Sequence, residues 1–357
     1  MAKANKIAVK IALALIFVGL SIGLIGLFAG AKFNIIWDEG KGLKVADFSK
    51  KTISDNLDDF NNISIDISHW NIELIKADKP HIEIEYYSED VPLYPVKGGT
   101  LNISETKEPS WQRKATIGLI NMQPMKAGTI KVYYSTAQMD EVSINTAAGN
   151  IRLKDALTAN RMLINSSYGN VSLTDCTANQ VLSVDMDSGA FEGKGLSTPL
   201  LEFENNYGNA KFNDSSFVKS TIDMSAGRIT FENCSLLESV TKSSYGNIIM
   251  KDCKTIEFDS IPNNELVPSI GIVSSSGDIN ISGQFDYITS VQSSYGSVKV
   301  NLPNQTQDSV DLKLNTSYGD IRVNGENKGN SHEKTSENFA TLQISADAGD
   351  ISVDFKK

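Results

Sequence analysis

Three cysteines and three histidines are the side chains of this sequence best suited to nucleophilic or metal chemistry. A catalytic cysteine needs a histidine within hydrogen-bonding reach, but His69, His81 and His332 keep no regular spacing from any cysteine. The chain contains no nucleophile elbow, phosphate-binding loop or zinc-ligand spacing. The sequence therefore predicts no catalytic residue, no cofactor and no metal site.

Paired carboxylates are the remaining catalytic candidates, because some glycan-degrading enzymes are parallel β-helices. Asp185 and Asp187 flank Met186, and Glu83 and Glu85 flank an isoleucine in the same way. This alternation places the carboxylates on the solvated face of a strand and the apolar residue in the core. We therefore favour a surface role for these carboxylates over a role in glycan degradation.

A glycine-centred motif recurs from residue 142 to the end of the chain and determines the expected fold. Apolar residues stand five positions before the glycine in nine of the ten copies, and again two positions after it. Alternation on both sides of a glycine indicates strand, turn, strand. The ten corner glycines, mostly 19 or 20 residues apart, are Gly149, Gly169, Gly189, Gly208, Gly227, Gly246, Gly277, Gly296, Gly319 and Gly349.

Such two-strand units cannot be stable alone, because each has one apolar face that only stacking can bury. We predict an all-β fold, a β-helix-like solenoid of about ten to eleven two-strand repeats. A four-strand coil of about 39 residues is the alternative. Asn or Asp usually follows the glycine, as at Asn170, Asn247 and Asp320. We interpret them as tight corners, since calcium-binding solenoids use a denser Gly-Gly-x-Gly-x-Asp pattern.

The residue before the glycine alternates between tyrosine and a small side chain, with one slip near the carboxyl end. The series is Ala148, Tyr168, Ser188, Tyr207, Ala226, Tyr245, Ser276, Tyr295, Tyr318 and Ala348. An exposed row of tyrosines could stack on sugar rings. Strand parity, however, places this position on the same side as the apolar positions, where large side chains would pack over small ones. We therefore expect the tyrosines to pack against the core.

The three cysteines occupy one repeat position, seven residues after a corner glycine. Other repeats have small or apolar side chains there, so buried free thiols are the favoured interpretation. Cys234 and Cys253 belong to consecutive repeats, and a disulfide between them is the alternative.

The amino terminus differs from the rest of the chain. Three lysines precede an uncharged run at 11–31, which is long enough for a membrane-spanning helix. The lysines favour a cytoplasmic amino terminus. A cleaved signal peptide ending at Ala29-Gly30-Ala31 is the alternative, although the apolar run exceeds the usual length of roughly 7 to 15 residues.

These features predict the organisation of the chain. Residues 1–10 are cytoplasmic, 11–31 form a signal-anchor helix, 32–60 a juxtamembrane linker, 61–141 an amino-terminal cap with the first coil, and 142–357 the regular repeats. The first coil is expected at Ile63 to Leu74, with Trp70 in the glycine position. Beyond residue 32 the chain has 29 basic and 43 acidic residues, a formal charge of −14. Such a charge repels nucleic acid and anionic lipid.

Three intervals between corner glycines are longer than the 20-residue unit, with extra residues near 259–269, 301–309 and 324–338. Their Pro, Asn, Gly, Ser and charged residues mark loops. Insertions on one face of a repeat protein often bind its partner, although tolerated solvent-exposed loops explain them equally well. The predicted partner-contact residues are Asp259, Asn263, Asn264, Glu265, Asn304, Gln305, Gln307, Glu326, Lys328 and His332. Lys356 and Lys357 are expected to protect the terminal edge from stacking.

Residues from about 60 to 357 resemble the bacterial putative-adhesin family of unknown function that includes the LiaG-like proteins. The resemblance rests on the strand patterns at Ile63–Leu74, His81–Tyr86 and Thr129–Tyr133, the segment Gly98–Ile103, and the Gly-Asn/Asp-Ile corners. It implies a β-solenoid-like fold at the cell surface and no established enzymatic activity.

We therefore expect a single-pass protein of the cell membrane with an extracellular carboxyl-terminal solenoid. Its function would be that of an adhesin or interaction scaffold without catalytic activity, with cell-wall polymer or another envelope protein as its partner. An envelope-stress accessory protein that acts through another membrane protein is the alternative. A polysaccharide-active β-helix enzyme is a third, less favoured interpretation.

Overall fold

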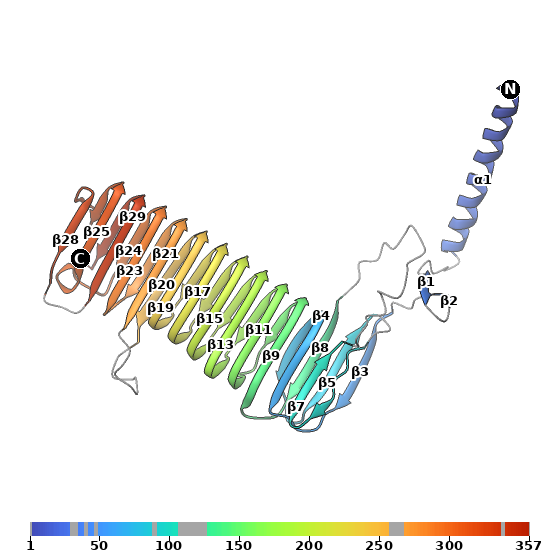
Figure 1. The fold of residues 1–357 in the computed structure, drawn as a ribbon, viewed down its shortest axis with the longest axis horizontal. Helices are drawn as coiled ribbons and strands as arrows, with labels where there is room; N and C mark the ends of the chain where they lie inside the picture. Colours follow the sequence, from blue (N-terminus) through green and yellow to red (C-terminus); the bar gives the residue numbers. More distant parts are fainter. Residues whose placement is uncertain are drawn as a thin grey trace. The chain divides into compact units, whose positions relative to one another are not determined.

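The computed structural model describes residues 2–28, 35–38, 42–45, 49–87, 91–105, 127–256, 268–336 and 340–356. The chain divides into two compact units. The smaller unit contains helix α1 (Ala2–Phe28) and an antiparallel pair, β1 (Ile35–Asp38) with β2 (Gly42–Val45). The larger unit contains all other strands, joined in one continuous sheet (Figure 1).

Helix α1 covers most of the apolar run at 11–31 and confirms its helical prediction. Side chains described between residues 10 and 25 are largely exposed, among them Leu15 at 68% and Phe17 at 75%. Within the described part of the chain, no helix combines the length and the hydropathy that crossing a membrane requires. The membrane-spanning role of this segment is therefore not confirmed and stays a proposal.

Each regular repeat of the larger unit forms one coil, which consists of a long strand, a glycine corner, a short strand and a second corner. The long strand β11 pairs in parallel with β9 and β13 of the neighbouring coils, and the short strand β12 pairs with β10 and β14. This pairing confirms the two-strand repeat and excludes the four-strand coil. The bounds are β9 (Met139–Ala148), β10 (Ile151–Leu153), β11 (Thr158–Tyr168), β12 (Val171–Thr174), β13 (Thr177–Ser188) and β14 (Phe191–Lys194).

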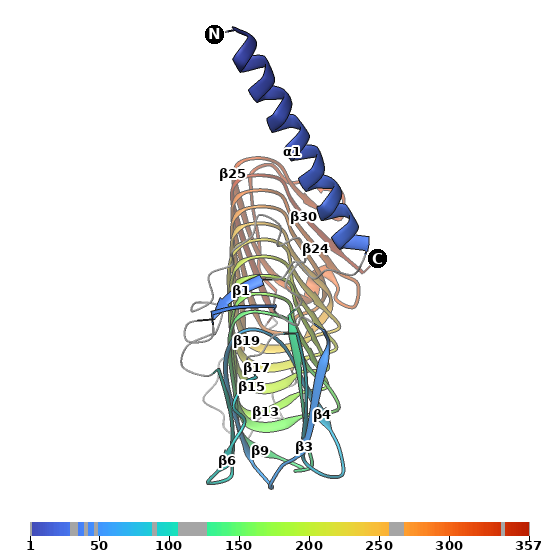
Figure 2. The same ribbon diagram turned by 90° about the vertical axis from the view of Figure 1, so that its right-hand side faces the viewer.

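The same arrangement continues through five more coils, which superimpose when seen along the stack in Figure 2. Their long strands are β15 (Ser197–Tyr207), β17 (Ser216–Ala226), β19 (Ser235–Tyr245), β21 (Ser269–Ser276) and β23 (Ile288–Tyr295). Their short strands are β16 (Ala210–Asn213), β18 (Ile229–Glu232), β20 (Ile248–Thr255), β22 (Ile279–Gln284) and β24 (Val298–Leu302).

Apolar side chains from the long and short strands fill the interior of the stack, as the period-two pattern predicts. Phenylalanines form a cluster there: the ring of Phe212 lies 5.1 Å from that of Phe191, 5.4 Å from Phe203 and 5.1 Å from Phe231, measured between centroids. All four are at most 1% exposed. Burial of each side chain contributes about 1.5–3 kcal/mol, so the core rather than disulfides stabilises the fold.

The two corners of each coil depend on different residue types. At the first corner, Gly208 has φ +143° and a Cβ there would lie 1.9 Å from the carbonyl oxygen of Gly189 in the preceding coil. Only glycine fits such a stack. The second corner has an Asp or Asn in the left-handed region in several coils, for example Asp175 with φ 53° and Asp214 with φ 51°, a conformation that these residues tolerate. In the coil between these two, Gly195 takes the same corner with φ 63°. The sequence pattern had not revealed this second corner.

The amino-terminal end of the solenoid is closed by β7 and β8, which pair with β4 in parallel, and by β3, β5 and β6, which join in antiparallel pairs. β4 is the predicted first coil: it pairs with β9 and β10, and Trp70 stands in the glycine position. β7 and β8 cover its other edge, β6 pairs with β7, and β5 and β3 continue the sheet from β8. The bounds are β3 (Lys51–Asn56), β4 (Asn62–Lys76), β5 (His81–Tyr86), β6 (Val96–Lys97), β7 (Thr100–Ser104) and β8 (Gly128–Tyr134). β3 lies within 32–60, the range that the sequence assigns to a linker.

At the carboxyl-terminal end the order of coils in space differs from their order in sequence. β29 lies between β23 and β25, and β30 lies between β24 and β26. The last coil of the chain is therefore the penultimate coil of the stack. The bounds are β25 (Asp311–Tyr318), β26 (Ile321–Val323), β27 (Glu326–Asn327), β28 (Ser331–Lys334), β29 (Thr341–Ala348) and β30 (Ile351–Phe355).

The free edge of this end belongs to β25, and the antiparallel strand β28 covers part of it. Antiparallel cover of this kind protects a parallel stack from pairing with another molecule. The expectation that the lysines after the last strand protect the terminal edge is therefore wrong for Lys356, because it follows the internal strand β30. Lys356 donates its backbone N–H to the carbonyl of Gln305 at 3.0 Å, and Lys357 lies outside the described residues.

Candidate functional site: an exposed aromatic ladder

The tyrosines that precede the corner glycines point into solvent. Between 65 and 81% of their surface is exposed in Tyr168, Tyr207, Tyr245, Tyr295 and Tyr318. The prediction that they pack against the core is wrong. They form the most exposed group of large aromatic side chains in the described part of the larger unit.

A bend in the backbone explains the error in parity. Neighbouring long strands pair Ser166 with Met186 and then Tyr168 with Ser188, while the residue between them has no partner in the register. The same residue, two positions before the glycine, is skipped in every regular coil. The strand turns there, so Ser166 is buried and Tyr168 is exposed although the two residues are two positions apart.

Tyrosines and small residues alternate without interruption once the coils are placed in their spatial order. Ala348 pairs with Tyr295 on one side and Tyr318 on the other, so the slip in the sequence disappears in the structure. At the opposite end, the exposed His69 pairs with Ala148. We call the exposed row the aromatic ladder, and its members are His69, Tyr168, Tyr207, Tyr245, Tyr295 and Tyr318. Adjacent strands lie about 4.8 Å apart, so an aromatic side chain recurs about every 9.6 Å.

Polar side chains line the ladder on its long-strand side. Asn206 donates through Nδ2 to Oδ1 of Asp187 at 3.3 Å, and Ser225 donates through Oγ to Oδ1 of Asn206 at 3.2 Å. All three side chains are exposed, and Asn206 directly precedes Tyr207. Hydrogen-bonding groups therefore run beside the aromatic rings from one coil to the next.

Asparagines form a second row on the other side of the corner. Oδ1 of Asn150 accepts the backbone N–H of Asn170 at 3.0 Å, and Oδ1 of Asn170 accepts that of Ala190 at 2.9 Å. Asn209 accepts from Arg228 in the same way at 3.0 Å. These bonds give the post-glycine residues a structural role at the corners, as interpreted from the sequence. Across the described ranges, no group of three or more His, Cys, Asp or Glu residues is suited to hold a metal ion.

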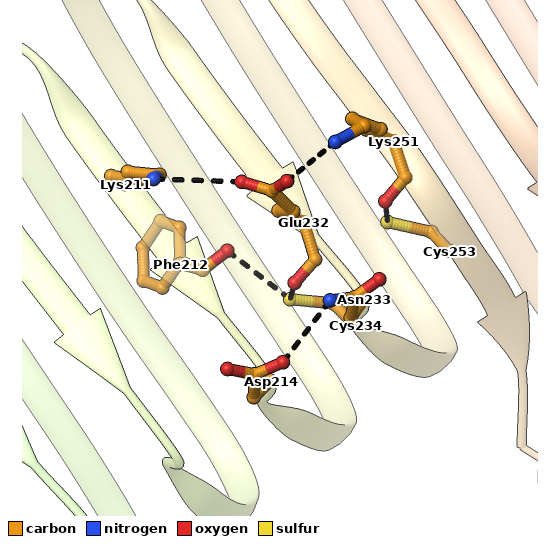
Figure 3. Close-up of polar contacts among 8 residues, drawn as sticks. All are labelled: Lys211, Phe212, Asp214, Glu232, Asn233, Cys234, Lys251 and Cys253. Atoms are coloured by element: carbon orange, nitrogen blue, oxygen red, sulfur yellow. Dashed lines mark hydrogen bonds and ion pairs between the residues drawn. The ribbon is translucent and has the colours of Figure 1, made fainter.

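The three cysteines are buried free thiols, which confirms the favoured interpretation over a disulfide. Cys234 donates to the carbonyl of Phe212 at 3.4 Å, and Cys253 donates to that of Lys251 at 3.5 Å (Figure 3). Burial raises the pKa of Cys176 to about 12. The hydrogen bond with Cys234, together with burial, also raises the pKa of Cys253. Because the thiolate is the nucleophile, the raised pKa values suit Cys176 and Cys253 to packing. The same hydrogen bond with Cys253 lowers the pKa of Cys234.

Ion pairs occupy the short-strand face of the same coils. Glu232 lies between Lys251 at 2.6 Å and Lys211 at 3.5 Å, and Asn233 donates to Asp214 at 3.2 Å (Figure 3). The bond with Lys251 is the main reason that the pKa of Glu232 lies below its usual value. Opposite charges on successive coils thus compensate one another on this face.

The predicted partner-contact loops differ in their placement. Asp259, Asn263, Asn264 and Glu265 lie outside the described residues. Gln305 is buried, and its side chain accepts the N–H of Phe285 at 3.2 Å and donates to the carbonyl of Phe285 at 3.0 Å. It therefore fixes the backbone of a neighbouring coil, whereas Asn304 is exposed.

Residues of the other two loops meet at the carboxyl-terminal cap. Asn324 donates to Oε1 of Gln307 at 3.2 Å, and Lys334 binds the carbonyl of Gln307 at 3.0 Å. Glu326 and Lys328 form an exposed ion pair at 2.7 Å. His332 pairs with Leu314 in the β28–β25 ladder, and partial burial is the main cause of its lowered pKa. These residues build the cap, and their predicted role in partner contact stays a prediction.

The carboxylates considered for catalysis lie on strand surfaces. Asp185 and Asp187 are exposed on either side of the buried Met186, as predicted. Glu83 forms an ion pair with Lys131 at 3.5 Å and accepts a hydrogen bond from Tyr133 at 3.1 Å. A surface depression of about 420 Å³ contains neither pair, and it is lined by Asp59, Phe60, Asn61, Gly99, Ser135 and Thr136.

These features define a capped, parallel β-solenoid with an exposed aromatic ladder at one corner. The chain belongs to the Toastrack DUF4097 family, which matches residues 60–354, and this confirms the predicted resemblance. No curated protein matches the sequence.

Similar solved structures share little sequence with this chain. One is a "putative lipid binding protein" from Parabacteroides distasonis, 12% identical, covering 87% of this chain and 97% of its own, with a TM-score of 0.39. Another is a "putative adhesin" from Parabacteroides merdae, 13% identical, with coverages of 87% and 97% and a TM-score of 0.36. A third is a "putative adhesin" from Bacteroides fragilis, 13% identical, with coverages of 86% and 97% and a TM-score of 0.29.

Proposed function

We propose that the protein is a membrane-anchored, non-catalytic scaffold of the cell surface that binds an envelope component through its aromatic ladder. The exposed row of large aromatic side chains is the observation that carries this proposal. Single exposed aromatic residues are ordinary, but a regular row of exposed aromatic side chains along one corner indicates an interaction surface. Tyrosine suits such a surface because it combines a large apolar ring with a hydroxyl group.

The anchor is the apolar segment at 11–31, with the amino terminus inside the cell and the chain from Phe33 onward outside. The three lysines before this segment support the orientation. Protease added to intact cells should then degrade the solenoid, while a tag at the amino terminus survives. Full protection of the solenoid would contradict the external location.

Binding can be measured with the full chain and washed cell-wall fragments. The variant Tyr168→Ser/Tyr207→Ser/Tyr245→Ser removes three neighbouring ladder side chains and should abolish co-sedimentation with the wall. Val240→Ser is a matched control, because Val240 is 37% exposed on the long strand of a ladder coil but lies off the ladder. Equal binding by the triple variant and the control would refute the role of the ladder.

An envelope-stress accessory role is the alternative, and the exposed Asn304 and Glu326 at the distal cap favour it as a contact for another membrane protein. Crosslinking in cells distinguishes the two functions. Recovery of a membrane protein, without retention on the wall, would support the accessory role. Turnover of any glycan by the purified chain would contradict both.

A further inference from the structure

We infer that the ladder binds a linear, non-anionic polysaccharide along the solenoid axis, with one disaccharide for every two coils. This inference rests on the proposed function, since it names the chemical class of the ligand for the same surface. It follows from the period of the ladder, the small residues between its members, the polar rows beside it and the local charge.

The period of the ladder is set by in-register stacking. Tyr207 pairs directly with Ser188 and Ala226, and Tyr245 with Ala226 and Ser276. Tyr168 and Tyr295 are separated by three such two-coil steps, or about 29 Å. In a β-1,4-linked pyranose chain each sugar is turned half a revolution from the last, so equivalent faces recur once per disaccharide. That repeat is close in length to two coils, and successive tyrosines can meet equivalent sugar faces.

The small residues on the alternate coils keep the aromatic side chains apart. Tyrosines on every coil would lie about 4.8 Å from one another, a separation at which aromatic rings pair among themselves. Ala226 between Tyr207 and Tyr245 prevents such pairing and leaves both rings free to contact a ligand. The alternation therefore suits a ligand that is itself periodic over two coils.

Hydroxyl groups of a polysaccharide require hydrogen-bonding partners along its whole length. The row formed by Asp187, Asn206 and Ser225 supplies a carboxylate, an amide and a hydroxyl on three successive coils beside Tyr207. The apolar faces of the sugars can thus lie on the tyrosine rings while the sugar hydroxyl groups bond to the polar row. A ligand with a single ring, or a lipid tail, would not contact both the tyrosine rings and the polar row.

The charge around the ladder selects among polymers. Asp185, Asp187, Glu204 and Asp223 are exposed on the coil of Tyr207 and on its two neighbours. The exposed Arg228 and Lys242 oppose them, and Lys242 pairs with Asp223, but acidic side chains stay in excess around Tyr207. Carboxylates in this density repel phosphate-bearing and carboxylated polymers. They repel the ladder of a second copy of this chain for the same reason. A neutral polymer is accepted, and amino groups on the sugars would add attraction to both carboxylates and tyrosine rings.

The test uses the full chain with insoluble chitin and cellulose as neutral probes and polygalacturonate as the anionic probe. Co-sedimentation should occur with at least one neutral polymer and not with polygalacturonate. If each ring contributes as much as an aromatic pair, Tyr207→Ser should weaken binding about two- to tenfold. Preference for polygalacturonate, or no retention by either neutral polymer, would overturn the inference. Tyrosine-dependent binding to cell wall would still stand in that case, so the two failures are distinguishable.

A register-swap variant tests the two-coil period itself. Ser188→Tyr combined with Tyr207→Ser keeps the number of exposed tyrosines but moves one ring to an adjacent coil. The swap should bind neutral polymer as weakly as Tyr207→Ser alone, while its circular dichroism and thermal unfolding stay unchanged. Binding equal to that of the unmodified chain would show that only the number of rings matters and would refute the match to a disaccharide repeat.

Discussion

The glycine corners provide the sharpest test of the stacked architecture, and Gly208→Ala is the most informative change. A Cβ at this position would lie 1.9 Å from the carbonyl oxygen of Gly189, and the backbone has φ +143°. The neighbouring atom belongs to the backbone, so no side-chain rotation can relieve the contact. The two coils must separate at this corner for alanine to fit.

The size of the expected destabilisation follows from the hydrogen bonds that this separation of the coils would break. The corner is held by the bond from N–H of Gly189 to the carbonyl of Tyr207 and by the bond from N–H of Phe191 to the carbonyl of Asn209, both 2.9 Å. Each contributes about 0.5–1.5 kcal/mol, and the unfavourable φ costs about 1–3 kcal/mol. We therefore expect Gly208→Ala to lower the free energy of unfolding by about 2–6 kcal/mol.

Gly325→Ala is the matched control, because Gly325 also has positive φ, at +82°, but a Cβ there meets nothing within 4 Å. It should cost only the backbone strain, about 1–2 kcal/mol. Urea unfolding followed by circular dichroism measures both variants, and amide hydrogen exchange should show lost protection around Gly189 only in Gly208→Ala. Equal destabilisation by the two substitutions would refute the collision between stacked corners.

Three further predictions concern the core, the thiols and the order of coils. Ile248→Asp should destabilise by several kcal/mol because Ile248 is fully buried, whereas Asp185→Ser at an exposed site should change urea unfolding by less than about 0.5 kcal/mol; comparable losses would contradict the assigned faces. Below pH 9 a thiol reagent should label Cys176 only after denaturation, since its pKa is raised to about 12; rapid native labelling would argue against burial. Deleting 340–357 removes an internal coil, so hydrogen exchange should show lost protection in both β23 and β25; loss confined to one of them would indicate a different coil order.

Much of the fold could be predicted because each repeat has the same spacing of apolar residues around its glycine. Ile164 and Val171 stand at fixed distances from Gly169, and both are buried as the period-two alternation requires. Trp70 could be assigned to the glycine position of a first coil because its neighbours keep the same spacing, and its strand pairs with the next coil as expected. The residues after the glycines could be assigned to tight corners because the denser glycine and aspartate pattern of calcium-binding solenoids is absent from the sequence. The side chains of Asn150 and Asn170 indeed accept backbone hydrogen bonds at these corners.

The candidate site could not be predicted in the same way, because parity holds only within a straight strand. The register skips Ser167, so Tyr168 changes sides relative to Ser166. Neither residue type indicates that bend, because serine is common in strands and turns, and tyrosine occurs both in cores and on surfaces. The alternation of tyrosine with small residues is visible in the sequence, but large-over-small packing in a core predicts the same alternation.

The sequence by itself thus determined the coil, its glycine corner, its apolar interior and the two-coil rhythm of tyrosines, since each depends on residues close together in the chain. Tertiary structure decided which way the tyrosines face and where the last coil lies. β29 enters between β23 and β25, a choice between similar parallel edges that local patterning cannot make. That insertion places Ala348 between Tyr295 and Tyr318 and completes the ladder, because side-chain neighbours across a sheet are set by strand pairing and not by position in the chain.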